Sequence, residues 1–271
     1  MKIIYTYKHT EGWDKGLDNE KAIYILRKSV EQANRWYETE MYCDSKGREE
    51  IINLDIPFTR IVVLKELEDY TSPNWGMMKL ISIKKQSKAH IHIDMDTIIL
   101  KPIEFDSTMD MMWGNAEVSM LYGKGHYSSL KYIYNHYLKT AEQYESKRVN
   151  DGFFDFSHAP NNSLLIINNP TKVNYIIQEL EQIIKPYCNV KSGNLNMFME
   201  QFMLMNLFRE RGGLIGYLPR KGEFHISDYY RDLILNNEIP FSDYEENGWL
   251  HFEHLNKYSL NEIIKILNNI K

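Results

Sequence analysis

Cysteine is scarce in this sequence, and its scarcity excludes several kinds of protein. The 271 residues include only two cysteines, Cys43 and Cys188, which lie far apart and form no C-x-x-C pair. Two isolated cysteines provide neither a disulfide framework nor a thiolate zinc site, and they are typical of proteins from reducing compartments. We therefore expect a cytoplasmic location.

Long apolar runs and an excess of basic charge are missing as well. No stretch has the roughly 20 apolar residues that cross a bilayer, so we expect no transmembrane segment, and peripheral membrane association stays open. The formal net charge of −5 argues against nucleic acid as a partner, because duplex binding needs a concentrated basic surface. Hydrophobic residues make up 43% of the chain, which is typical of a globular protein and not of a disordered one.

Strand-like and helix-like patterns alternate along the first third of the chain. Short β-rich runs predict strands, and apolar residues at spacings of three and four predict helices. This alternation predicts an α/β fold with a mainly parallel central sheet flanked by helices, whose ligands bind beyond the carboxyl ends of the strands. The expected strands are 3–7, 40–44, 60–64, 90–94, 117–122, 163–167, 216–218 and 249–252; the expected helices are 19–37, 75–85, 127–144, 173–184, 196–211 and 259–270, with a loop at 147–159.

Two carboxylates, Asp94 and Asp96, stand one residue apart at the end of one of these apolar runs. In an extended chain, residues i and i+2 share a face, so both carboxylates can point at one hard cation. A metal ion held at a strand end is suited to gripping a diphosphate. A lone D-x-D is also compatible with a plain strand end carrying two solvated aspartates, so the rest of the chain has to decide.

Three other segments carry polar residues of related chemistry in a fixed order around this motif. Together with Asp94 and Asp96 they resemble the metal-dependent, retaining sugar-nucleotide transferases of glycosyltransferase family 8, the group of glycogenin and the bacterial lipopolysaccharide galactosyltransferases. The resemblance covers most of the chain, from the first strand to Lys257. It rests on Lys79 before the D-x-D motif, on Asn162-Ser163, on Glu200-Gln201, and on His251-Phe252 followed by Lys257.

The resemblance implies a GT-A type fold and a function. It implies Mn²⁺ (or Mg²⁺) as the cofactor and a nucleotide diphosphate sugar, UDP-linked, as the donor. The acceptor would be a carbohydrate, a glycolipid or a protein, as in bacterial polysaccharide biosynthesis. Residue by residue, it implies metal binding by Asp94, Asp96 and His251, donor binding by Lys79, Asn162 and Lys257, and catalysis at the reacting sugar by Glu200 and Gln201.

The sequence departs from the family pattern at three positions. Leu164 stands where glycine is usual after Asn162-Ser163, Glu200 replaces an aspartate, and His254 replaces a glycine three residues after His251. The last change leaves open whether His251 or His254 binds the metal ion. The six-residue spacing to Lys257 favours His251.

Nucleotide binding is expected at the ends of the first two strands. A doubly wound fold places the base there, so Tyr7, next to Thr6, could stack on uracil and Asp44 could accept its N3–H. Packing for Tyr7 and a simple turn at Asp44 are equally compatible with the sequence. His90 and His92 alternate on the strand before the D-x-D motif, and we interpret them as hydrogen-bonded strand residues and not as metal ligands.

We expect one domain over residues 1–271, because neither a repeat nor a long linker divides the chain. It would consist of a nucleotide-binding half (1–100), an acceptor half with the C-terminal metal and diphosphate element (101–258) and a closing helix (259–271). Two alternatives come from other classes: a haloacid-dehalogenase-like phosphatase, with Asp94 as nucleophile and Asp96 as general acid, and a non-catalytic nucleotide-sugar-binding protein.

Overall fold

The described residues of the computed structural model form two compact units. Unit 1 comprises Met1–Lys65, His90–Phe105 and Leu218–Lys271, and unit 2 comprises Glu66–Ala89 and Asp106–Tyr217. The prediction of a single domain stays a prediction. Within these ranges the structure describes residues 1–10, 16–69, 75–118, 158–184, 198–218, 248–252, 258–268 and 270, with only the backbone at 75, 115–118, 158–159, 184 and 198.

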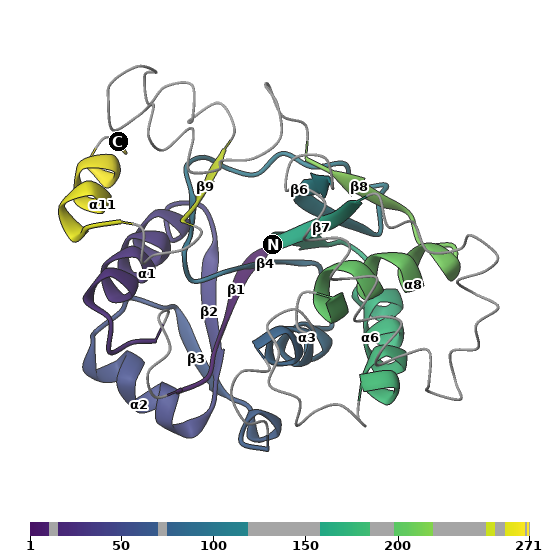
Figure 1. Cartoon of the computed structure of the whole chain (residues 1–271), viewed down its shortest axis with the longest axis horizontal. Coiled ribbons are helices and arrows are strands. Elements are labelled where there is room, and N and C mark those ends of the chain that lie inside the picture. Colours follow the sequence, from purple (N-terminus) through teal and green to yellow (C-terminus); the bar gives the residue numbers. More distant parts are fainter. Residues whose placement is uncertain are drawn as a thin grey trace. The chain divides into compact units, whose positions relative to one another are not determined.

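Unit 1 contains four parallel strands in the order β3-β2-β1-β4 (Figure 1). Residues of β1, β2 and β4 are buried almost throughout, as is usual for a parallel sheet covered on both faces. The direction in which successive strands are added to the sheet reverses at β1, because β2 pairs with one edge of β1 and β4 with the other. Ligands of doubly wound folds bind at such a reversal, beyond the carboxyl ends of the strands. The strands are β1 Lys2–Tyr7, β2 Glu38–Cys43, β3 Arg60–Val63 and β4 His90–Ile93.

Two helices connect these strands. Helix α1 (Glu20–Ala33) begins at Asn19, whose side chain accepts a hydrogen bond from the amide of Lys21, and it ends before the predicted residue 37. Helix α2 (Ser45–Asn53) was not predicted; it begins where a simple turn at Asp44 was one alternative, and the side chain of Asp44 caps it. A short 3₁₀ helix, η1 (Lys65–Leu67), follows β3.

A two-stranded antiparallel ribbon completes the described part of unit 1. It pairs β5 (Thr97–Ile99) with β9 (Trp249–His251). Gly248, which precedes β9, has a φ of 82° that favours glycine, and its carbonyl accepts the amide of Leu100 at 2.8 Å. The C-terminal helix α11 (Leu260–Leu267) begins with a capping box at Ser259 and Glu262.

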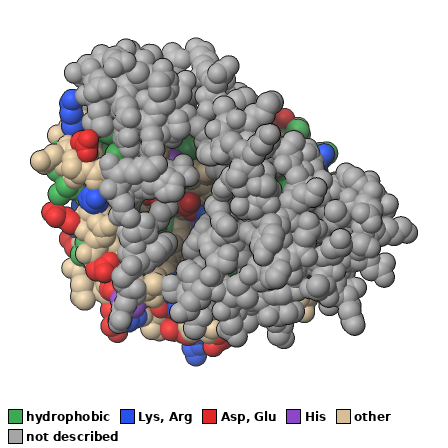
Figure 2. Space-filling view, in the orientation of Figure 1, with side chains coloured by type: hydrophobic (Ala, Val, Ile, Leu, Met, Phe, Trp, Pro, Cys, Tyr) green, Lys and Arg blue, Asp and Glu red, His purple; other side chains and the backbone are tan. Residues whose placement is uncertain are grey.

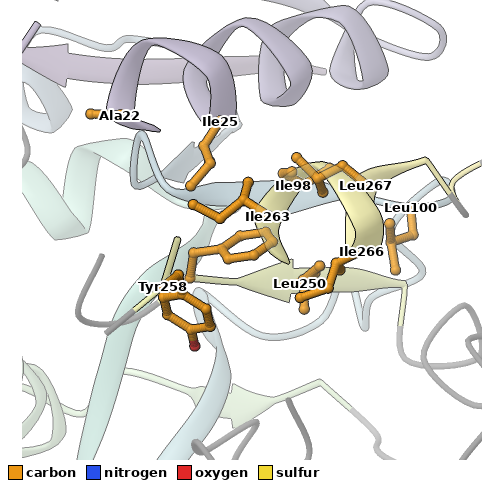
Figure 3. Packing of buried hydrophobic residues seen from close by; sticks show 10 residues of the cluster. Ala22, Ile25, Ile98, Leu100, Leu250, Tyr258, Ile263, Ile266 and Leu267 are labelled. Atoms are coloured by element: carbon orange, nitrogen blue, oxygen red, sulfur yellow. The ribbon is translucent and has the colours of Figure 1, made fainter. Parts of the chain in front are cut away.

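The ribbon and α11 share one hydrophobic core with α1 (Figure 3). Burial of these side chains holds β9 beside β5, although the two strands are far apart in the sequence. The cluster contains Ala22 and Ile25 of α1, Ile98 and Leu100 at β5, Leu250 and Phe252 at β9, and Tyr258, Ile263, Ile266 and Leu267 at the C-terminal helix.

Unit 2 has a mixed sheet of three strands. β6 pairs with β7 in the antiparallel direction and with β8 in the parallel direction. Helix α3 packs against α6, α6 against α8, and the π-helix η4 against β7. The elements are α3 Trp75–Lys84, β6 Met111–Val118, β7 His158–Ile167, α6 Pro170–Ile184, η4 Phe198–Met203, α8 Leu204–Glu210 and β8 Ile215–Tyr217.

The predicted α/β class with a mainly parallel sheet flanked by helices is confirmed, but several element boundaries were wrong. β6 begins at Met111 and not at residue 117, and β7 begins at His158 inside the predicted loop. The helix predicted over 196–211 starts as a π-helix. The helix predicted over 127–144 lies outside the described residues.

Two surface properties follow from the described residues. No helix among them has both the length and the apolar character needed to span a bilayer. On the described part of the face in Figure 2, acidic and basic side chains are interspersed and do not separate into patches of one sign.

Candidate functional site

Asp94 and Asp96 lie in a turn between β4 and β5. β4 ends at Ile93, β5 begins at Thr97, and the amide of Thr97 donates to the carbonyl of Asp94 at 3.0 Å. Asp96 is buried and Asp94 is half-buried. The prediction that both carboxylates share one face of an extended strand was therefore wrong, because a turn brings them together.

His251 joins these two carboxylates from the other strand of the ribbon. It lies opposite Thr97 in the antiparallel register, and the amide of Phe252 donates to the carbonyl of Asp96 at 2.8 Å. As a result, His251 Nε2 lies 3.4 Å from Asp96 Oδ1. One ligand atom from each of Asp94, Asp96 and His251 lies within 4.8 Å of the others.

This triad fits a hard or borderline divalent cation. In an octahedral site with bonds of about 2.1 Å, neighbouring ligand atoms are about 3 Å apart, close to the 3.4 Å between His251 and Asp96. Carboxylate oxygens with one imidazole suit Mn²⁺ or Mg²⁺ better than a soft metal. Three protein ligands leave octahedral positions for phosphate oxygens or water.

A second polar cluster lies inside unit 2. Lys79 of α3 and Glu200 of η4 form an ion pair of 3.0 Å whose side chains are 7% and 1% exposed. The ammonium of Lys79 also donates to the carbonyl of Asn162 at 3.4 Å. The side chain of Asn162 accepts from the indole N–H of Trp113 at 2.6 Å and donates to the carbonyl of Glu200 at 2.5 Å.

Three residues predicted for donor binding and catalysis thus meet in this cluster: Lys79, Asn162 and Glu200. Gln201 follows on η4 and is 8% exposed. A π-turn widens the helix by one residue and is found frequently at functional sites. The amide of Asn162 holds the main chain of that turn through the Glu200 carbonyl.

Thr6 and Tyr7, predicted to contact the nucleotide base, end β1 and contact other side chains of unit 1. Thr6 Oγ1 lies 3.1 Å from His92 Nε2, and the hydroxyl of Tyr7 donates to Glu50 Oε2 at 2.8 Å. Burial, together with the hydrogen bond to Glu50, raises the pKa of the Tyr7 hydroxyl. Stacking of Tyr7 on a base stays a prediction.

Asp44, also predicted at the base, has a structural role at the start of α2. Its Oδ1 accepts the amides of Gly47 at 2.9 Å and His9 at 3.2 Å, and its Oδ2 lies 3.5 Å from Lys8 Nζ. A Cβ at position 47 would lie 2.7 Å from this carboxylate and 2.8 Å from the Tyr7 ring, so the cap needs glycine there. Base recognition by Asp44 stays a prediction beside this capping role.

Other parts of the site were missed or lie outside the described residues. Trp113 was missed, because no sequence signal indicates its hydrogen bond to Asn162. Glu50, the partner of Tyr7, lies on a helix that was not predicted. Lys257 and His254 lie outside the described residues.

Comparisons with known proteins give structural likenesses and one family. No curated protein matches the sequence. Similar solved structures include mouse xyloside xylosyltransferase 1 in its apo form, with 12% identity, a TM-score of 0.49 and coverage of 95% of this chain and 99% of that one. The glycosyltransferase GlyE of Streptococcus pneumoniae TIGR4 has 11% identity and a TM-score of 0.48, with coverage of 98% of this chain and 62% of that one.

A third similar structure is the inositol-1-phosphate CTP transferase of T. maritima, with 9% identity, a TM-score of 0.49 and coverage of 100% of this chain and 96% of that one. The similar structures thus include glycosyltransferases and a CTP transferase. The model of one family matches residues 5–269. The chain belongs to this family, DUF6734, a family of unknown function.

Proposed function

We propose that the protein is a GT-A type glycosyltransferase that moves a sugar from a nucleotide diphosphate sugar to an acceptor and depends on a divalent cation. The observation that supports the proposal is that His251, from a distant segment of the chain, has a ligand atom within 4.8 Å of those of Asp94 and Asp96. The three ligand atoms lie beyond the carboxyl end of β4, beside the reversal of strand order at β1. A phosphatase mechanism on Asp94 and Asp96 would give His251 no role.

The residues of the chain would have three roles: binding the cation, binding the donor and acting at the reacting sugar. Asp94, Asp96 and His251 would hold Mn²⁺ or Mg²⁺, which when bound supplies Lewis-acid stabilisation of the departing diphosphate. Thr6, Tyr7 and Asp44 would contact a uridine base, and Lys79, Asn162 and Lys257 would bind the donor. Glu200 and Gln201 would act at the reacting sugar, with retention of configuration. The acceptor is proposed to be a carbohydrate, a glycolipid or a protein.

Chelation should abolish turnover of the donor. A panel of UDP-, GDP- and CDP-sugars, scored for release of the nucleoside diphosphate, should show activity with Mn²⁺, none with EDTA, and recovery when Mn²⁺ is restored in excess. UDP-sugars should be the best donors. Full activity in EDTA would contradict the proposed metal dependence.

The same assay separates the competing functions. Release of inorganic phosphate from phosphate esters, with no consumption of nucleotide sugar, would favour the phosphatase. Release of pyrophosphate from a nucleoside triphosphate would indicate nucleotidyl transfer. Metal-dependent binding of the donor without any turnover would favour the non-catalytic binding protein.

Replacement of His251 by alanine should weaken the binding of Mn²⁺ and of UDP together, because both would share one site. Loss of a group that only supports a metal ligand lowers metal affinity by about 10–100-fold, so loss of the ligand itself should lower it at least as much. Isothermal titration with each ligand measures both affinities. His254→Ala is the matched control and should change them little. Loss of Mn²⁺ binding in His254→Ala alone would show that the wrong histidine was chosen.

A further inference from the structure

A chain of buried hydroxyl groups connects the core of unit 1 to the turn that carries the metal ligands. The hydroxyl of Tyr5 on β1 lies 2.9 Å from Ser29 Oγ on α1. Ser29 Oγ donates to the carbonyl of Thr97 at 2.5 Å. Both side chains are completely buried. Thr97 is the residue directly after Asp96.

The direction of these hydrogen bonds is fixed by chemistry. A carbonyl oxygen can only accept, so the single proton of Ser29 points to Thr97. Tyr5 must then donate its own proton to Ser29 Oγ. Burial raises the pKa of Tyr5, despite the hydrogen bond with Ser29, so its hydroxyl keeps that proton at neutral pH. The order of donation is therefore Tyr5 to Ser29 to Thr97.

Thr97 links the hydrogen bonds of Tyr5 and Ser29 to both strands of the ribbon that carries the triad. Its amide donates to the carbonyl of Asp94 at 3.0 Å, which closes the turn. It also lies opposite His251 in the β5–β9 register. A shift of Thr97 would therefore move Asp94, Asp96 and His251 relative to one another.

Helix stability alone does not explain a serine at position 29. Its neighbours on the buried face of α1 include Leu26, Val30 and Ala33. Alanine would be the better helix former there, and it would bury no polar group. The hydroxyl is accounted for by its bonds to Tyr5 and Thr97.

We propose that Tyr5 and Ser29 are positioning residues for the metal centre, which hold the turn after β4 in the geometry that gathers Asp94, Asp96 and His251. Both residues are completely buried and neither belongs to the triad. This inference rests on the proposed function, because it concerns the same cation site. It gives Tyr5 and Ser29 a role in cation binding in addition to their place in the core of unit 1.

The test is Mn²⁺ affinity in the absence of any donor, measured by electron paramagnetic resonance of the free ion. Ser29→Ala should raise the Mn²⁺ dissociation constant by at least about tenfold, as loss of a group that orients metal ligands does. Ser82→Ala is the matched control. Ser82 is also completely buried, but its hydroxyl donates to Met78 within α3, so the dissociation constant should stay within about twofold of wild type.

Tyr5→Phe provides a second, milder variant. It keeps the ring, which packs edge-on against Phe58 at 5.2 Å, and it leaves the donation from Ser29 to Thr97 in place. The dissociation constant should rise, but less than in Ser29→Ala. In the double variant the two effects on the dissociation constant should be less than additive, because Tyr5 and Ser29 act through the same series of hydrogen bonds to Thr97.

The outcomes distinguish this inference from the proposed function. If wild type binds Mn²⁺ and Ser29→Ala binds it as tightly as Ser82→Ala does, the positioning role is wrong and the proposed function stands. If wild type itself binds no Mn²⁺, the proposed function fails and this inference fails with it. If Ser29→Ala does not fold, Tyr5→Phe provides the test. A wild-type Mn²⁺ affinity in Tyr5→Phe would contradict the proposed positioning role.

Discussion

Replacement of Asp96 by asparagine should lower metal-dependent turnover by at least about a thousandfold. Asparagine keeps the size of the side chain and removes the charge that would hold the cation. Asp96 Oδ1 also lies 3.4 Å from His251 Nε2. Initial rates of nucleoside diphosphate release at saturating donor and Mn²⁺ measure the effect.

The fold should survive this change. Asp94 and Asp96 each have a carboxylate oxygen within 4.8 Å of one on the other, so the loss of one charge relieves repulsion between like charges. Removal of one charge should leave the thermal midpoint of the metal-free protein unchanged or raise it. Asp18→Asn, at an exposed position, is the control and should keep full activity. Near-normal turnover in Asp96→Asn would mean that the D-x-D motif is structural and that the central assignment is wrong.

The second large effect concerns the buried pair of Lys79 and Glu200. Lys79→Met should destabilise the protein by about 3–5 kcal/mol, because it takes the ammonium away from a buried carboxylate. Combining it with Glu200→Leu should recover most of that loss, since apolar residues often replace a buried ion pair at little cost. Denaturant unfolding measures both free energies.

The turnover of these variants should not recover with their stability. The single and the double variants should all lack turnover, because the proposed donor and catalytic groups are gone even when the fold is restored. Recovery of turnover in the double variant would show that the pair only stabilises the fold. Lys84 and Glu181 provide the control, because Lys84 lies on the same helix and this pair is 31% and 19% exposed. Its disruption should cost at most about 1 kcal/mol and leave activity intact.

The parts of the fold that the sequence predicted depend on local patterns. β1 and α1 have regular apolar spacing, and Asn19 is an ordinary helix cap. The resemblance to glycosyltransferase family 8 led to the prediction that Asp94, Asp96 and His251 would gather, and the structure does bring them together. The turn that brings Asp94 and Asp96 together was not predicted.

The parts that were missed depend on contacts between distant residues. Helix α2 has weak apolar periodicity, and its first turn is fixed by the Asp44 cap and by the contact of Gly47 with Tyr7. The short strand β5 exists because β9 pairs with it. The hydrogen bond from Trp113 to Asn162 joins two strands whose pairing no local pattern reveals.

If the proposed cation binds, the shared core of α1, the ribbon and α11 would couple its affinity to the pairing of β5 with β9. His251 lies near the two carboxylates through that pairing, and the packing of Ile263 and Ile266 in the shared core would favour the paired state over an unpaired one. The apparent dissociation constant is the intrinsic one divided by the paired fraction. Core substitutions in the C-terminal helix would therefore alter cofactor binding without touching a ligand, and the cation in turn would hold the two distant segments together.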